Sequence, residues 1–136
     1  VSHRDLEAFT FDATQCPDLF PALVALAAAA EGVSTIYGIE RLRGKESDRG
    51  EVLRSEYAKL GIDIEIDYDE DEMRVIGGQI EAAEVDSHDD HRIAMSLAIS
   101  ALRTDNEIVI KNSDCVSKSY PSFFADLESL KTKKCE

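Results

Sequence analysis

Residues 17–32 read PDLFPALVALAAAAEG, and residues 33–39 continue as VSTIYGI. The first stretch is almost wholly apolar and predicts a buried helix, with Asp18 as its N-cap and Pro21 in its first turn. Gly32 follows where a left-handed C-terminal cap is expected. The second stretch is rich in β-branched residues and predicts a strand. A buried helix that leads directly into a strand indicates an α/β fold.

The flanking sequence extends this helix and strand into a longer series of elements. Residues 6–14 (LEAFTFDAT) alternate apolar and polar side chains, as a strand does. Residues 45–61 predict a half-exposed helix that ends at a glycine. Residues 62–66 and 73–78 predict two strands of a hairpin joined by an acidic turn. The resulting order is β-α-β-α-β-β.

After two glycines at positions 77 and 78 the same order starts again. A strand, an apolar helix, a strand and a helix are expected over residues 79–85, 90–102, 107–111 and 120–130. We therefore expect one complete β-α-β-α-β-β unit over about residues 6–77 and a partial second unit over residues 79–130. Residues 131–136 are expected to form a tail.

Composition narrows the class of protein. The chain has 136 residues, 43% of them hydrophobic, which fits one globular domain or a piece of a larger protein. Its formal net charge of −13 argues against binding to nucleic acid or to an anionic membrane. The apolar run over residues 19–30 is too short to cross a bilayer. Any anion that the chain binds therefore needs a local basic site.

The cysteines indicate the redox compartment, and the first residue indicates how the chain relates to a longer polypeptide. Cys16, Cys115 and Cys135 are too scattered for a disulfide framework, so a reducing compartment such as the cytoplasm is expected. The chain starts with Val1 and carries no basic-then-apolar leader pattern. We therefore expect a segment of a longer polypeptide.

Charged residues gather where the four predicted helices begin. A helix N-terminus presents unpaired N–H groups and a positive dipole end, and basic side chains are disfavoured there unless an anion is bound. The pattern therefore favours a carboxylated or phosphorylated metabolite as ligand, and two nearby acids could move protons. The acids are Asp18 and Glu46, and the cations are Lys45, Arg49, Arg92 and Lys118.

Each position also has a plainer interpretation. Asp18 alone fits a helix cap, and residues 45–49 fit a solvated first turn. Residues 86–91 (DSHDDH) contain ligand types for zinc, manganese or iron, so a metal-dependent hydrolase centred on His88, Asp90 and His91 stays open. Capping is the simpler role for Asp90. The hydroxyl groups before the fourth helix favour turn roles; they belong to Ser117, Ser119 and Tyr120.

Four stretches resemble, in order and at similar spacing, the C-terminal portion of the 5-enolpyruvylshikimate-3-phosphate (EPSP) synthases, a family of enolpyruvyl transferases. They are CPDLFPALVALAAAAEG (16–32), RLRGKESDR (41–49), DSHDDHRIAMSLAISAL (86–102) and CVSKSYPSFFADL (115–127). The resemblance covers about residues 11–130. It implies repeated β-α-β-α-β-β units in the inside-out α/β barrel of that family. Residues 1–130 would then belong to the C-terminal domain, and the N-terminal domain would lie outside this chain.

The resemblance also implies a reaction. Members of the family transfer the enolpyruvyl group of phosphoenolpyruvate to the 5-hydroxyl of shikimate 3-phosphate and release phosphate. The step belongs to the shikimate pathway to chorismate and the aromatic amino acids, and it is the target of glyphosate. It uses no metal and no organic cofactor. The active site lies between two domains, so the isolated chain is expected to be inactive. A phosphometabolite-binding module without catalysis remains the alternative.

Residue roles follow from the same resemblance. Asp18 would take the proton of the shikimate hydroxyl, and Glu46 would give a proton to the methylene carbon and later remove one. Lys45 would lie near both substrates. Contacts with shikimate 3-phosphate would come from Asp18, Arg41 and Lys45, and those with phosphoenolpyruvate from Lys45, Arg49, Arg92 and Lys118. Gln15 and His91 are candidates for the surroundings of the site.

Overall fold

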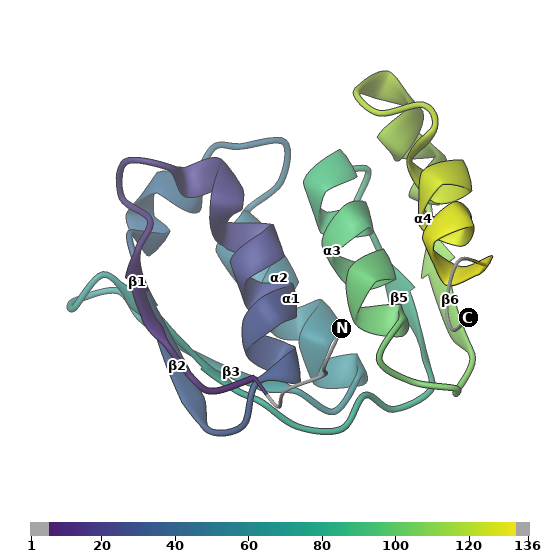
Figure 1. Cartoon of the computed structure of the whole chain (residues 1–136). Helices are drawn as coiled ribbons and strands as arrows, with labels where there is room; N and C mark the ends of the chain where they lie inside the picture. Colours follow the sequence, from purple (N-terminus) through teal and green to yellow (C-terminus); the bar gives the residue numbers. More distant parts are fainter. Residues whose placement is uncertain (1–5, 133–136) are drawn as a thin grey trace.

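The computed structural model describes residues 6–132, which form two successive runs of strands and helices (Figure 1). The first run comprises β1 (Thr10–Asp12), α1 (Phe20–Ala29), β2 (Val33–Tyr37), α2 (Arg49–Lys59), β3 (Asp63–Asp67) and β4 (Glu72–Ile76). The second comprises β5 (Ala83–Asp86), α3 (His91–Ala101), β6 (Ile108–Lys111) and α4 (Phe123–Thr132). Short 3₁₀ helices precede α1, α2 and α4, namely η1 (Pro17–Leu19), η2 (Ile39–Leu42) and η3 (Ser113–Lys118). The predicted order of one complete unit and a partial second is confirmed.

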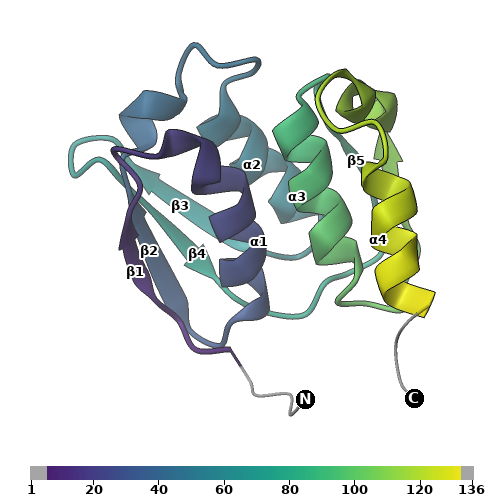
Figure 2. The same cartoon turned by 45° about the horizontal axis from the view of Figure 1, so that its top comes forward.

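The first unit is a four-stranded sheet covered by helices on one face. Its strand order is β1-β2-β4-β3, with β1 parallel to β2 and β4 antiparallel to both of its neighbours. Ile36, Met73 and Val75 on one face are fully buried, and α1 and α2 pack over that face (Figure 2). The opposite face carries polar side chains, such as Arg74 paired with Glu65 at 3.4 Å. This alternation is what a sheet with one covered face requires.

The second unit begins with a parallel pair of strands. β5 and β6 pair so that Val85 lies opposite Ile110. α3 follows β5 and lies between α1 and α4 (Figure 2). A small apolar cluster of Ala94, Ala98 and Phe123 joins α3 to α4. The second unit therefore continues the helix layer of the first.

A buried hydrogen-bond network connects the first three helices. The Tyr57 hydroxyl on α2 lies 2.7 Å from Ser96 Oγ and 2.8 Å from Ser100 Oγ on α3. Ser96 Oγ also donates to the carbonyl of Pro21 in α1, at 2.7 Å. Burial raises the pKa of Tyr57 to about 12, so its hydroxyl stays protonated. These bonds join the C-terminal half of α2 and the middle of α3 to the first turn of α1.

The chain leaves the first unit through a close crossing at Gly77. Its N–H donates to Gly32 O at 3.0 Å, and the next N–H, of Gly78, donates to Ala28 O at 3.2 Å. A Cβ on Gly77 would lie 1.6 Å from the carbonyl oxygen of Ala30. Only glycine fits where the chain passes the end of α1.

The first helix differs at both ends from the sequence expectation. Residues 17–19 form η1, so α1 begins at Phe20 with Leu19 as its N-cap. Asp18 therefore does not cap the helix, and its side chain is directed elsewhere. At the other end α1 stops at Ala29, so Gly32 belongs to the turn into β2 rather than to a helix cap.

Other boundaries also shift. α2 begins at Arg49 with Asp48 as its N-cap, which leaves residues 45–47 in the preceding loop rather than in the helix. α4 runs to Thr132, two residues into the expected tail, and residues 133–136 lie outside the described residues. Cys135 and Val1 also lie outside them.

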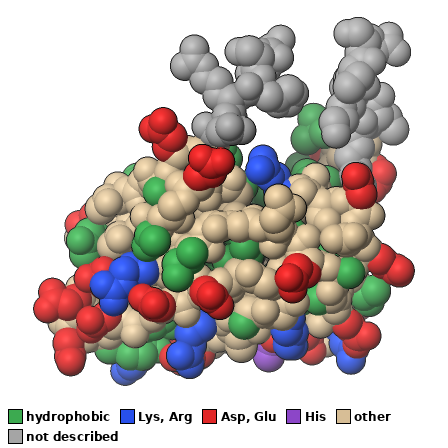
Figure 3. Space-filling model, turned by 90° about the horizontal axis from the view of Figure 1, so that it is seen from below, with side chains coloured by type: hydrophobic (Ala, Val, Ile, Leu, Met, Phe, Trp, Pro, Cys, Tyr) green, Lys and Arg blue, Asp and Glu red, His purple; other side chains and the backbone are tan. Residues whose placement is uncertain are grey.

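The surface agrees with the acidic composition. On the face seen in Figure 3, red acidic side chains outnumber blue basic ones. None of the helices within residues 6–132 is long and apolar enough to cross a lipid bilayer.

Candidate active site

Three helices bring their N-termini to the same end of the molecule. α1, α2 and α3 all begin at the upper end of the view in Figure 1. The turn of η1 carries Asp18, the loop before α2 carries Lys45 and Glu46, and the first turns of α2 and α3 carry Arg49 and Arg92. These five predicted site residues form one connected cluster.

Arg49 is the centre of this cluster, and its side chain is only 1% exposed. Its Nε and Nη2 bind the two carboxylate oxygens of Asp90, at 2.8 and 3.1 Å. Nη1 donates to Asp18 Oδ1 at 3.0 Å, and Nη2 donates to Glu46 Oε2 at 2.7 Å. Burial lowers the pKa of Arg49, but the carboxylates around it outweigh that effect and raise the pKa above its usual value. The guanidinium is therefore a permanent buried cation.

Asp90 holds this cation and starts α3. It is 0% exposed, and its Oδ1 accepts the backbone N–H of Arg92 at 3.1 Å, as an N-cap does. Its Oδ2 also accepts the hydroxyl of Ser47 at 2.8 Å. Burial raises the pKa of Asp90, yet the hydrogen bonds from Arg49 and Ser47 reverse the sign, so its pKa is lowered. Asp90 thereby ties the beginning of α3 to the beginning of α2.

Two half-exposed acids complete the cluster on its solvent side. The side chains of Asp18 and Glu46 are 54% and 52% exposed, although both bind the buried Arg49. Asp18 also lies 3.8 Å from Lys45 Nζ and 3.9 Å from Arg92 Nη2. Two carboxylates that reach solvent beside two partly exposed cations can exchange protons with a bound anion.

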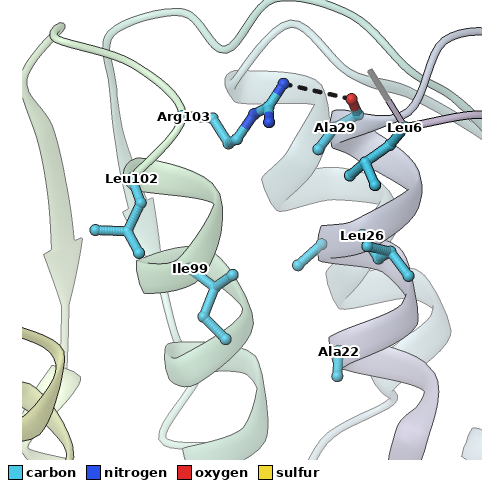
Figure 4. Close-up of a pocket in the computed structure, with 8 residues that line it drawn as sticks. Leu6, Ala22, Leu26, Ala29, Ile99, Leu102 and Arg103 are labelled. Atoms are coloured by element: carbon cyan, nitrogen blue, oxygen red, sulfur yellow. Dashed lines mark hydrogen bonds between the residues drawn. The ribbon is translucent and has the colours of Figure 1, made fainter. Parts of the chain in front are cut away.

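Two hollows lie along the helices, and the smaller one borders this cluster. A hollow of about 160 Å³ is lined at one end by Asp18 and Arg92 and elsewhere by apolar side chains such as Met95 and Phe123. A larger hollow of about 390 Å³ lies between α1 and α3 and is almost wholly apolar (Figure 4). At the upper end of this hollow in Figure 4, the Arg103 guanidinium donates a hydrogen bond to the carbonyl of Ala29. None of the predicted site residues lines the larger hollow.

Two predicted cations lie outside the cluster. Lys118, in η3, is exposed and binds Asp89 at 3.2 Å, next to the buried Asp90. Arg41, in η2, donates to the carbonyl of Thr14 at 2.7 Å. Gln15 and His91 were the two candidates for the surroundings of the site. Gln15 is exposed between β1 and η1, and His91 is the first residue of α3.

The metal-site interpretation of residues 86–91 is not supported by the geometry. His88 Nε2 lies 3.1 Å from Glu56 Oε2, whereas Asp90 turns to Arg49 and Ser47. Within residues 6–132, no group of three or more His, Cys, Asp and Glu side chains is arranged to hold a metal ion. His88 and Asp90 therefore bind other side chains of the protein.

Glu56 forms the second buried acid network beside the cluster. It is 2% exposed and accepts hydrogen bonds from Lys59 Nζ at 2.8 Å and from the backbone N–H of Asp86 at 2.7 Å. Burial raises the pKa of Glu56, but the bonds from Lys59, Asp86 and His88 outweigh it and lower the pKa. The charged form of this acid is therefore the one that the fold stabilises.

These two acids predict acid sensitivity of the folded state. The pKa values of Asp90 and Glu56 lie below their usual values of 3.8 and 4.5. The stability that these two carboxylates give to the folded state is therefore fully present when the pH is above those usual values. It is lost as the pH falls through the lower folded pKa values. We expect the urea midpoint to be level between about pH 7 and 5 and to fall below about pH 4. Glu56→Gln should flatten this fall, and a midpoint that rises toward acid would contradict the assignment.

Comparison with known proteins identifies the family. A sequence model of the family described as EPSP synthase (3-phosphoshikimate 1-carboxyvinyltransferase) matches residues 1–127. The chain belongs to the EPSP synthase family. It is 45% identical over 135 residues to the 3-phosphoshikimate 1-carboxyvinyltransferase of Clostridium perfringens strain SM101, and 44% identical over 128 residues to that of Methanocella arvoryzae. The alignments cover 96% and 94% of this chain.

Solved structures agree with this family assignment. An EPSP synthase from Acinetobacter baumannii superposes with a TM-score of 0.74 at 36% identity, over 81% of this chain and 26% of that one. The enolpyruvyl transferase NikO from Streptomyces tendae gives a TM-score of 0.71 at 22% identity, over 96% of this chain and 29% of that one, which shows a shared fold. The chain spans about 30% of the length of its curated EPSP synthase relatives.

Proposed function

We propose that this chain is the C-terminal part of an enzyme that transfers the enolpyruvyl group of phosphoenolpyruvate to the 5-hydroxyl of shikimate 3-phosphate. The observation that carries the proposal is the cluster around Arg49. There, two solvent-reaching acids share one buried guanidinium, with Lys45 and Arg92 beside them. Membership of the EPSP synthase family supplies the reaction to which such a cluster is suited.

The acids carry the proton transfers of an addition and an elimination. In the addition, Asp18 takes the proton of the 5-hydroxyl while the oxygen of that hydroxyl bonds to C2 of phosphoenolpyruvate. Glu46 gives a proton to C3. In the elimination, Glu46 removes a proton from C3, the C2–C3 double bond re-forms, and the C2–O bond to phosphate breaks. Asp18 gives the proton that it took from the hydroxyl to the departing phosphate. Both acids are half exposed and so are accessible to a substrate.

The cations differ in how they meet an anionic substrate. Lys45 and Arg92 are partly exposed and can bind its carboxylate or phosphate directly. Arg49 reaches a substrate only when Asp18 or Glu46 moves off its guanidinium. Lys118 and Arg41 lie farther out and would contact the substrates after side-chain rotation. Neither metal nor organic cofactor enters this scheme.

The rest of the site would come from another part of the same polypeptide. The apolar hollow between α1 and α3, with Leu26, Ile99 and Leu102 each 40–45% exposed, fits a surface that upstream sequence covers. We place the two units at about residues 6–77 and 79–130 of a C-terminal domain, with an N-terminal domain completing the active site. The cytoplasm is the compartment that this assignment favours.

The complete polypeptide and the isolated chain should differ in activity. We expect the complete polypeptide to release phosphate from phosphoenolpyruvate only when shikimate 3-phosphate is present, because both half-sites are then assembled. The isolated 136-residue chain should show no turnover. A coupled phosphate-release assay on both proteins measures this. Saturable binding of both substrates by the complete polypeptide without turnover would favour the binding module instead.

A further inference from the structure

The loop that carries two of the site residues has few contacts with the rest of the fold apart from those that these two residues make with the cluster. It runs over residues 43–48, between η2 and α2. Leu42 before it is fully buried, and Ser47 near its end bonds to Asp90. In between, Gly44 has a φ of +75°, and a Cβ there would meet no atom within 4 Å. Besides the contacts of Lys45 with Asp18 and of Glu46 with Arg49, the position of this span depends on how residue 43 is held.

Residue 43 is held by an aromatic ring. The Arg43 guanidinium carbon lies 4.4 Å from the ring centroid of Tyr68, which directly follows β3. Arg43 also lies 3.7 Å from the carboxylate of Glu40, but both of those side chains are about half exposed. A guanidinium over an aromatic face is attracted by the ring quadrupole, and that attraction is less weakened by solvent than an exposed ion pair.

The ring is fixed in turn by the helix that follows the loop. The Tyr68 hydroxyl donates to Glu51 Oε1, in the first turn of α2, at 2.7 Å. Hydrogen bonding from Tyr68 lowers the pKa of Glu51, and burial together with Glu51 raises the pKa of Tyr68. The phenol therefore stays protonated and the carboxylate stays charged at neutral pH. One side chain thus connects the β3–β4 hairpin, the first turn of α2 and the start of the loop.

We propose that Arg43 and Tyr68 are positioning residues, whose stacking holds the loop so that Lys45 and Glu46 face Asp18 and Arg49. This rests on the proposed function for its kinetic consequence, but the positioning itself is a property of the chain. Neither residue contacts the cluster around Arg49. Their effect reaches it through the backbone of residues 44–47.

Kinetics of the complete polypeptide separate the ring face from the hydroxyl. Tyr68→Leu and Arg43→Ala should lower kcat/KM by about two- to fivefold, the factor that an exposed cation–π contact supplies, with the larger share in kcat. Tyr68→Phe keeps the ring face but loses the bond to Glu51 that holds the ring, so its kcat/KM should lie between those of the parent enzyme and Tyr68→Leu. The double variant Arg43→Ala/Tyr68→Leu should lose no more than the worse single variant, because both remove the same contact.

Arg54→Ala is the matched control. Arg54 binds the same Glu51 as Tyr68 does, but it lies on the exposed side of α2 and does not contact the loop. It should leave kcat and KM at parental values. If Arg54→Ala lowers kcat/KM as much as Tyr68→Leu does, the effect is general loosening of α2, and the proposal is wrong.

Amide hydrogen exchange tests the same proposal without activity. In Tyr68→Leu and Arg43→Ala, the amides of residues 44–47 should exchange at least about twofold faster, while those of α1 and α3 keep their rates. Parental exchange rates at residues 44–47 in both variants would overturn the positioning role. If the complete polypeptide has no transferase activity, the proposed function fails, and the exchange result still decides on Arg43 and Tyr68.

Discussion

Asp18→Ala and Glu46→Ala, each introduced into the complete polypeptide, should lower turnover by about two decades or more, as expected for loss of a general acid or base. Both side chains reach solvent from a cluster whose remaining charges are cations or buried. Initial rates of phosphate release at saturating substrates measure the effect. The loss should appear mainly in kcat, because the cations that bind the substrates remain.

Two controls accompany this prediction. Asp48→Asn removes the charge of an exposed acid of the same loop but keeps an oxygen to cap α2, and this side chain binds Glu51 N rather than the Arg49 guanidinium, so its turnover should stay close to that of the parent. Asp18→Asn keeps the size of the side chain while removing its basicity, and should be as inactive as Asp18→Ala. Turnover within about fivefold of the parent for Asp18→Ala or Glu46→Ala would refute the assigned proton transfers.

Asp90→Ala should lower the free energy of unfolding by about 3–5 kcal/mol, the cost of removing the buried partner of a buried charge, because only the half-exposed Asp18 and Glu46 then remain beside Arg49. The change removes two hydrogen bonds from Arg49 and the N-cap of α3 together. Urea unfolding at pH 7 measures the loss. Arg49→Met combined with Asp90→Ala should recover part of it, because the buried cation that lost its buried partner is then gone.

The neighbouring acid provides the comparison. Asp89→Asn alters an exposed residue whose side chain binds the exposed Lys118, and asparagine tolerates the positive φ of this position, so the free energy of unfolding should change by less than about 1 kcal/mol. If Asp90→Ala costs no more than Asp89→Asn, the pair between Asp90 and Arg49 is not what joins α3 to α2.

The order of the elements was predictable because it depends on local patterns. The apolar run of residues 20–30 and the alternating isoleucines at 62, 64 and 66 have no other economical explanation than a buried helix and a one-faced strand. The start of α1 was not predictable in the same way. Whether residues 17–19 continue the helix or form η1 depends on packing against the rest of the fold.

That small difference decides the role of Asp18. As an N-cap its carboxylate would bind its own helix, whereas in η1 it binds Arg49, which lies 31 residues further along the chain. The partnership of Arg49 with Asp90 was equally hidden. Both residues lie at predicted helix beginnings, and the predicted capping role of Asp90 is confirmed, but the bonds between the two residues span 41 positions of the chain. Ser47 was expected in the first turn of the helix over residues 45–61, and its bond to Asp90, 43 residues further along the chain, was not predicted.

Gly77 has a consequence for how sequences of this kind can vary. Several glycines in the chain are required by a positive φ, a requirement that asparagine or aspartate can sometimes meet at modest cost. At position 77 the obstacle is a carbonyl oxygen where the first side-chain carbon would be, so every other amino acid is excluded alike. A library that randomises the link between the two units should leave that codon fixed and place its diversity at Gly78, where a Cβ meets no atom closer than 3.8 Å.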